Sequence, residues 1–114
     1  MTSAKHEGRL VKADGLVIEC PFTASKAWWD ASRRRFIVLM DYYANRAAKR
    51  FANIEAYDGT GTCLWTAALP EGSGPDAYTE AEITSAGITA YSFSGNRCLI
   101  DSETGQLLRQ QFVK

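Results

Sequence analysis

Side chains that carry most enzyme chemistry are scarce in this sequence. Its 114 residues include one histidine, His6, and three cysteines without a CxxC spacing. A Ser-His or Cys-His arrangement would have to recruit His6 from an N-terminal stretch that we expect to be frayed. No zinc-ligand spacing occurs, and no GxxxxGK[ST] or strand-linked GxGxxG sequence offers a cradle for nucleotide phosphates. The sequence therefore predicts a protein that is not an enzyme and uses no metal or cofactor.

An excess of charge and a long apolar run are also missing. Lys plus Arg and Asp plus Glu number 13 each, so no overall field attracts nucleic acid or an anionic membrane. The longest apolar run, Phe36 to Met40, is far shorter than the ~20 residues of a spanning helix, and no secretory signal is visible. We expect a cytoplasmic protein in which Cys20, Cys63 and Cys98 are buried free thiols, with a disulfide between two of them left open.

What the chain does have is the composition of a globular domain. Hydrophobic residues make up 46% and charged residues 23% of the sequence. Its length fits one domain, residues 1–114. The polar segment "PEGSGPDA" at 70–77 predicts an exposed loop inside that domain, because the remainder after it is too short to fold alone.

Apolar residues alternate with polar ones along most of the chain, which is the pattern of antiparallel strands with one wet face. In "NIEAYD", Ile54 and Ala56 point away from Glu55 and Tyr57. "RFIVLMD" at 35–41 is apolar throughout and predicts a central strand buried on both faces. Asp, Gly and Ser between the runs predict hairpin turns. The predicted strands are roughly 9–13, 15–20, 26–29, 35–41, 51–57, 62–69, 79–84, 88–93, 97–101 and 106–113.

Two segments are also compatible with one or two helical turns. "TASKAWWDASRR" places small and aromatic residues at helical spacing behind a capping Thr23, and "YYANRAAKRFA" is rich in Ala and Arg. The sequence leaves one short helix open at either place.

One phrase occurs twice, as "NIEAYDGTGTCLW" at 53–65 and "NRCLIDSETGQLLR" at 96–109. Each copy predicts a strand ending in Asp, a turn containing Gly and Thr, and a return strand. The phrase resembles the repeat of quinoprotein-type and WD-type β-propellers, and the chain is similar to small bacterial proteins of unassigned activity that carry it. We therefore expect an all-β antiparallel meander of blade-like hairpins, with about eight to ten short strands, that closes as a sandwich or partial propeller.

Paired carboxylates are the one catalytic option that the sequence offers. Glu80 and Glu82 would share a strand face about 6.6 Å apart, which suits acid and base work on a sugar. A solvated strand face explains the same pattern, and we favour it. Asp58 and Asp101 precede the two repeated turns, where their side chains would bond backbone amides, and Asp41 would do likewise.

Basic and aromatic residues stand close together at "RRR" 33–35 and "NRAAKR" 45–50. With Tyr42 and Tyr43 beside them they resemble a nucleic-acid patch, but the zero net charge favours solvated turns or an acidic protein partner. Adjacent Trp28 and Trp29 would face opposite ways on a strand, so one is exposed unless a loop or partner covers it.

The sequence predicts a protein-binding module, as a small bacterial inhibitor or immunity-type protein that masks a partner's functional surface. Two alternatives are a carbohydrate-binding or carbohydrate-processing domain and a homo-oligomer that completes its sheets between chains, since unpaired strand edges attract partners. The predicted partner-binding residues are Trp28, Trp29, Tyr42, Tyr43, Arg46 and Arg50.

Overall fold

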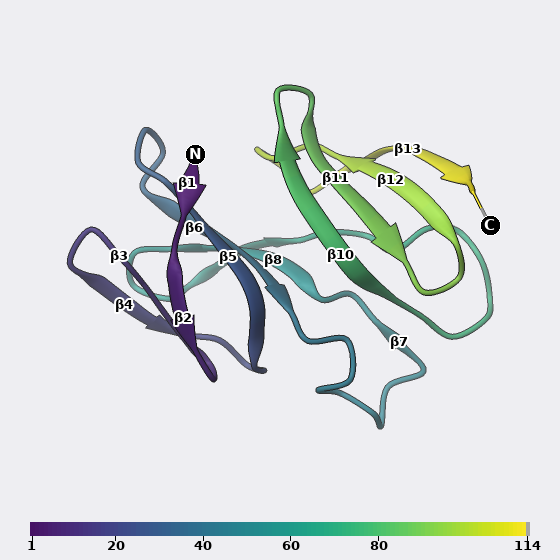
Figure 1. Cartoon of the computed structure of the whole chain (residues 1–114), viewed down its shortest axis with the longest axis horizontal. Helices are drawn as coiled ribbons and strands as arrows, with labels where there is room; N and C mark the ends of the chain where they lie inside the picture. Colours follow the sequence, from purple (N-terminus) through teal and green to yellow (C-terminus); the bar gives the residue numbers. More distant parts are fainter. Residues whose placement is uncertain (114) are drawn as a thin grey trace.

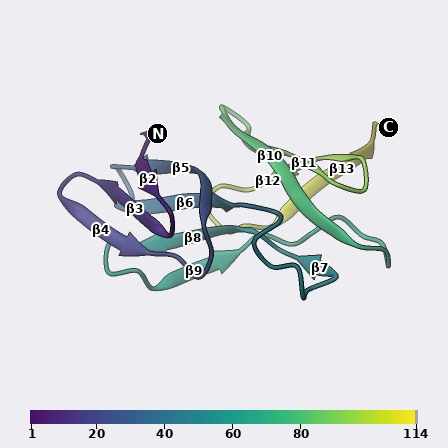
Figure 2. The same ribbon diagram turned by 60° about the horizontal axis from the view of Figure 1, so that its bottom comes forward.

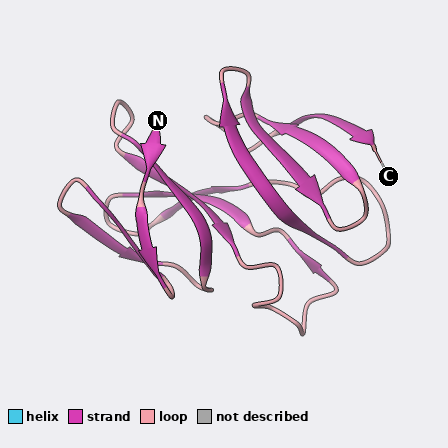
Figure 3. Cartoon of the chain, in the orientation of Figure 1, coloured by secondary structure: helices cyan, strands magenta, loops and turns pink. Residues whose placement is uncertain are grey.

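The computed structural model describes residues 1–113, which contain thirteen β-strands and no helix (Figures 1 and 3). The strands form a central sheet, a C-terminal sheet and a smaller N-terminal sheet. Every pairing is antiparallel except a short parallel one between β7 (Arg50–Phe51) and β10 (Asp76–Thr84). The predicted all-β fold class is confirmed.

The central sheet has the order β1-β5-β6-β8-β9. Its strands are β1 (Thr2–Ser3), β5 (Ala24–Asp30), β6 (Arg35–Met40), β8 (Ile54–Asp58) and β9 (Cys63–Thr66). All of β6 is buried, with Phe36 and Val38 in the core shared with the N-terminal sheet and Ile37 and Leu39 in the core shared with the C-terminal sheet. The prediction of a central strand buried on both faces is confirmed.

The two outer sheets flank this central layer. The N-terminal sheet contains β2 (Lys5–Glu7), β3 (Leu10–Ala13) and β4 (Leu16–Glu19). The C-terminal sheet has the order β13-β12-β11-β10-β7, with β11 (Gly87–Ser92), β12 (Asn96–Ile100) and β13 (Leu107–Phe112). Figure 1 shows the strands β2 to β4 and the hairpins β10 to β13 on opposite sides of β5, β6 and β8, and Figure 2 shows β5, β6, β8 and β9 stacked beside the N-terminal sheet.

Buried Asn53 joins the central and C-terminal sheets. Its amide nitrogen donates hydrogen bonds of 2.7 Å to the carbonyl oxygens of Met40 and Tyr78, and its side-chain oxygen accepts one of 2.8 Å from the Tyr78 amide. A side chain that satisfies three buried backbone groups at once is costly to replace. Asn53 therefore fixes the spacing between the two layers.

The two copies of the repeated phrase form β8–β9 and β12–β13, the last hairpin of each larger sheet. The Asp58 carboxylate accepts bonds from the Thr60 hydroxyl and from the amides of Thr60 and Thr62, and these bonds hold the pKa of Asp58 below its ordinary value. Asp101 accepts a bond of 2.7 Å from the amide of Glu103. The structural role predicted for these aspartates is confirmed.

Three details of the sequence prediction are wrong. Neither segment proposed for a helix is helical, because 24–30 pairs with β6 along its length and 41–48 folds into turns closed by Ala44 N–H to Asp41 C=O and Ala48 N–H to Asn45 C=O. The loop at 70–77 ends earlier than expected, since Asp76 and Ala77 are buried in β10. His6 lies in β2 rather than in a frayed end.

The thiols divide into two environments. Among residues 1–113 all three cysteines are free, with Cys20 and Cys98 buried as expected. Cys63 is exposed on the edge strand β9, which corrects the prediction of burial. Burial, with a smaller effect of the Glu55 charge, raises the pKa of Cys20 to about 11. A search of the described residues finds no helix that could cross a membrane.

Candidate partner-binding site

An aromatic groove lies where the 42–51 segment meets the start of β10 and the turn after β11. The groove has a volume of about 400 Å³. The side chains that form its walls are Tyr42, Tyr43, Arg46, Lys49, Phe51 and Phe93. Tyr43 is 58% exposed and Phe93 is 59% exposed, so two large rings present much of their surface to solvent. We call this feature the aromatic groove.

Local backbone geometry explains how the tyrosines reach this position. The Asp41 carboxylate accepts a bond of 2.9 Å from the Tyr43 amide, which turns the chain directly after the central strand β6. The two rings then stack on each other with centroids 4.1 Å apart and planes 33° apart. The guanidinium of Arg46 lies 5.7 Å from the Tyr43 ring centroid, within the range of a cation–π contact.

The opposite wall is tied to the tyrosine segment by backbone contacts. Arg50 and Phe51 pair in parallel with Asp76 and Ala77. The Arg50 guanidinium donates bonds of 2.7 Å and 2.8 Å to the carbonyl oxygens of Gly74 and Pro70. Arg50 therefore holds the backbone beside the groove and is not among the residues that line it, and its role as a partner contact stays a prediction.

The groove region holds both cations and carboxylates. Arg46 and Lys49 make no ion pair with any residue in the described range 1–113. The Asp76 carboxylate is buried and accepts bonds from the Ser94 amide at 3.0 Å and the Ser94 hydroxyl at 2.7 Å. Asp41 is engaged by the Tyr43 amide, as described above. Arg46 and Lys49 are therefore the exposed charged groups of the groove, while the carboxylates of Asp41 and Asp76 are less exposed and keep their negative charges.

The two adjacent tryptophans lie outside the groove. Trp29 is 5% exposed and packs against Phe36, with ring centroids 4.7 Å apart. Trp28 points to the other face of β5, where it is half-buried against the core of the C-terminal sheet. The predicted opposition of the two rings is confirmed. Core packing covers Trp29 and leaves Trp28 partly exposed, and their role as partner contacts stays a prediction.

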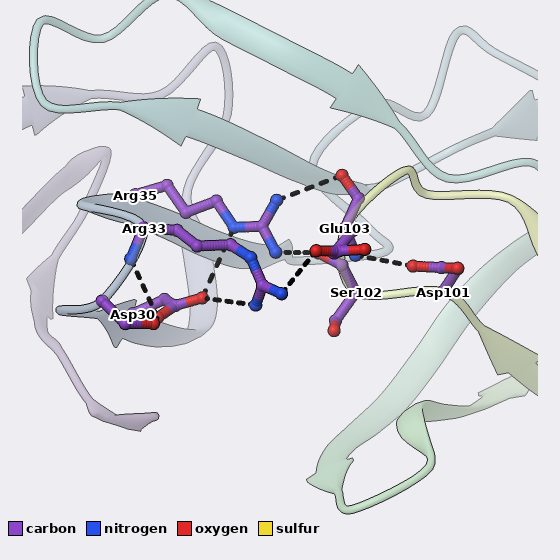
Figure 4. Close-up of polar contacts among 7 residues, drawn as sticks. Asp30, Arg33, Arg35, Asp101, Ser102 and Glu103 are labelled. Carbon is purple, nitrogen blue, oxygen red and sulfur yellow. Dashed lines mark hydrogen bonds and ion pairs between the residues drawn. The ribbon is translucent and has the colours of Figure 1, made fainter.

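The basic run at 33–35 is used inside the molecule (Figure 4). Arg35 is buried at the start of β6 and donates to the backbone carbonyls of Ser102 and Glu103. Arg33 pairs with the carboxylates of Glu103 and Asp30. The 33–35 part of the predicted basic patch therefore forms a joint between the β5–β6 turn and the β12–β13 turn.

Asp30 stays ionised inside this joint. Burial alone would raise its pKa, but bonds from Ser32 and Arg33 and the charge of Arg35 outweigh burial, so the pKa of Asp30 lies below its ordinary value. Its carboxylate is 3.6 Å from the Arg35 Nε atom. The third arginine of the run, Arg34, is 3.3 Å from the Asp14 carboxylate and stacks over Trp29 at 5.6 Å.

Glu80 and Glu82 share the exposed face of β10, but their environments differ. The Glu80 carboxylate lies 2.5 Å from Lys26 Nζ and accepts a bond of 3.1 Å from the Ala81 amide. The Lys26 bond in particular holds the pKa of Glu80 below its ordinary value, whereas a general acid needs a raised pKa. This geometry disfavours the carbohydrate-processing alternative.

Sequence reasoning missed Phe93 and Lys49. Phe93 stands in "FSGN", which we interpreted only as a turn, although an aromatic residue in a turn is itself a sign of exposed apolar surface. Lys49 was included in a basic cluster without a role of its own. No group of three or more His, Cys, Asp or Glu side chains that could hold a metal ion occurs in the described part of the chain.

Comparison with known proteins identifies a family. No curated protein and no solved structure matches the chain. Residues 6–112 match the family described as Domain of unknown function (DUF7957). Nothing in that match bears on β-propeller repeats, so the resemblance of the repeated phrase stays a prediction. Because the match spans most of its length, the chain belongs to the DUF7957 family.

Proposed function

We propose that this protein is a non-catalytic protein-binding module that holds its partner in the aromatic groove. The observation that supports the proposal is the placement of two strongly exposed rings, Tyr43 and Phe93, on one groove. Contiguous exposed apolar surface is uncommon on proteins that work alone and commonly marks an interaction site. Aromatic residues and Arg are also the types that dominate binding energy at interfaces.

The groove is built to bind without large rearrangement. The β7–β10 pairing and the Arg50 bonds hold both walls, so a partner would meet preformed backbone. The Arg46 guanidinium, already stacked on Tyr43, would lose little conformational freedom on binding. A preorganised site of this kind favours a specific partner over loose adhesion.

The exposed cations of the groove suggest the chemistry of the partner. Arg46 and Lys49 would attract an acidic protein surface and speed its encounter. A small cytoplasmic inhibitor or immunity-type protein, which masks a partner's functional surface, fits this description. Such a role needs a rigid patch and no catalytic group.

The test is a capture experiment from the native host with matched variants. Wild-type protein is compared with Tyr42→Ala/Arg46→Ala and Tyr43→Ala/Phe93→Ala, and bound proteins are named by mass spectrometry. Purified partner is then titrated, and we expect each double variant to lose about 1 kcal/mol or more of binding free energy. Val17→Ala is the control, because Val17 is 56% exposed on the N-terminal sheet and outside the groove. Unchanged affinity in both double variants would reject the groove.

A further inference from the structure

The outer face of the C-terminal sheet carries a regular arrangement of polar and aromatic side chains. Register pairs place its side chains in two rows across the four strands β10 to β13. The first row is Glu80, Tyr91, Arg97 and Gln111, and the second row is Glu82, Thr89, Leu99 and Arg109. Residues directly opposite each other across a ladder point to the same face, so all eight side chains share one surface. We call it the two-row face.

The charged side chains of the two-row face are separated by sign across the sheet. Each row begins with an acid on β10 and has its base on β12 or β13, so one side of the face is negative and the other positive. The side chains of Glu82 and Arg109 make no hydrogen bond or ion pair with any other residue in the described range. Exposed Tyr91 lies between the two sides.

The partners already present leave this pattern intact. Lys26 neutralises Glu80 from the edge of the sheet, and Arg97 donates a bond of 2.9 Å to Gln111. The groups left to act across an interface are therefore Glu82, Arg109, the Tyr91 ring and the Arg97 guanidinium, which keeps its charge beside the neutral Gln111. Because one side of the face is negative and the other is positive, a second copy of the face in the same orientation would place like charges opposite each other. A second copy rotated by a half-turn would place opposite charges together.

We propose that two copies of this chain associate face to face through the two-row face. A twofold axis parallel to the strands and between β11 and β12 places β10 of one copy over β13 of the other. Glu82 then faces Arg109 of the second copy, and the Tyr91 ring faces its Arg97. Both contacts occur twice, as a closed twofold interface requires. The pairs are an ion pair and a cation–π contact.

The room above the two-row face and the area of the interface determine how tightly we expect the dimer to associate. A depression of about 410 Å³ lies over the β11 to β13 part of the face and is lined by the members of both rows on these strands, so side chains from a second copy have room there. Four strands span only about 20 Å, so the interface falls at the small end of known protein interfaces and we expect a weak dimer. The charge contacts would make it sensitive to salt.

Sedimentation equilibrium at protein concentrations up to about 1 mM tests the proposal, in low and high salt. We expect wild type to dimerise in low salt. Glu82→Arg and Arg109→Glu should each weaken the dimer at least about tenfold, because each variant places like charges at both contacts. Mixing the two variants should restore association as a heterodimer, and Glu82→Arg/Arg109→Glu in one chain should restore the homodimer.

Two results would overturn the proposal. One is a wild-type protein that stays monomeric over the whole concentration range. The other is a dimer that neither single variant weakens or that the charge exchange fails to restore. Circular dichroism and thermal melting of each variant confirm that the fold persists, since both positions are exposed. The aromatic groove lies elsewhere, so this outcome is independent of the proposed function.

Discussion

The Arg35 guanidinium, at the start of β6, donates a hydrogen bond of 3.1 Å to the backbone carbonyl of Glu103 in the turn between β12 and β13. The same group also bonds to the Ser102 carbonyl and faces the Asp30 carboxylate. A charged side chain of the central sheet thus holds the last hairpin of the C-terminal sheet in place (Figure 4).

Replacing Arg35 should destabilise the fold strongly. Arg35→Met removes two hydrogen bonds to backbone carbonyls and leaves Asp30 with exposed Arg33 as its remaining cationic partner, which we expect to lower the free energy of unfolding by about 3 kcal/mol. Urea unfolding followed by circular dichroism measures the change. Arg34→Met is the matched control, because Arg34 is an exposed neighbour and its pair with Asp14 should contribute less than about 1 kcal/mol. Equal losses in the two variants would contradict the role of Arg35.

Asn53 should be hard to replace for a different reason. Asn53→Ala leaves the Tyr78 amide and the carbonyl oxygens of Met40 and Tyr78 short of a buried hydrogen-bond partner. We expect a loss of about 2 kcal/mol or more in the free energy of unfolding. Asn96→Ala removes a single side-chain bond to Ser94 near the surface and should cost much less. A similar melting temperature for both variants would show that Asn53 does not join the sheets.

Stability should fall in acid through three carboxylates. Hydrogen bonds and nearby cations lower the pKa of Asp58, Asp30 and Glu80 in the folded state. The unfolded chain therefore binds protons first as the pH falls, so the stability from these groups is complete above their unfolded pKa of about 4 and is lost below it. Urea midpoints across this range measure the slope. Asp58→Asn should reduce the slope, and an unchanged slope would show that Asp58 does not contribute.

Gly105 tests a close contact between the two repeated hairpins. Its φ of +75° favours glycine, and an added Cβ would lie 2.5 Å from the Trp65 ring. Gly15 has the same φ of +75° with open space around it. Gly15→Ala should therefore cost about 1 kcal/mol from backbone strain alone, and Gly105→Ala should cost clearly more because the ring must move. Equal losses of stability in the two variants would mean that the Trp65 ring moves away from the added methyl group without an energetic cost.

The alternation of apolar and polar residues is a property of each strand by itself, and for this reason the sequence is sufficient to predict the fold class. Each of the ten predicted strands has a counterpart in the structure, including the buried strand at 35–40. The strands that it misses, β1, β2 and β7, are only two or three residues long. Strands β1 and β7 pair with segments that only the tertiary fold brings near, whereas β2 forms a local hairpin with β3. The "TASKAWW" helix failed because its two tryptophans gain more from entering separate cores than from helical spacing.

The candidate site is less visible in the sequence, because distant contacts decide it. Tyr42, Tyr43 and Arg46 are neighbours in the chain and remain together in space. Phe93 joins them only because β7 pairs with β10. In the sequence, the arginines at 33–35 have the appearance of a solvent-exposed basic run. Only the structure shows that the turn at 102–103 supplies the hydrogen-bond acceptors of Arg35. No local sequence pattern identifies an intramolecular contact between residues that lie so far apart in the chain.

The joint at Arg35 also sets an order for biosynthesis. The carbonyl oxygens that accept its hydrogen bonds belong to Ser102 and Glu103. During translation, β5 and β6 emerge from the ribosome long before those residues exist, and the guanidinium must stay hydrated until they arrive. The central layer consequently reaches its final form only after the β12–β13 turn has been synthesised, so a nascent chain stalled before that turn would present an unfinished core to chaperones.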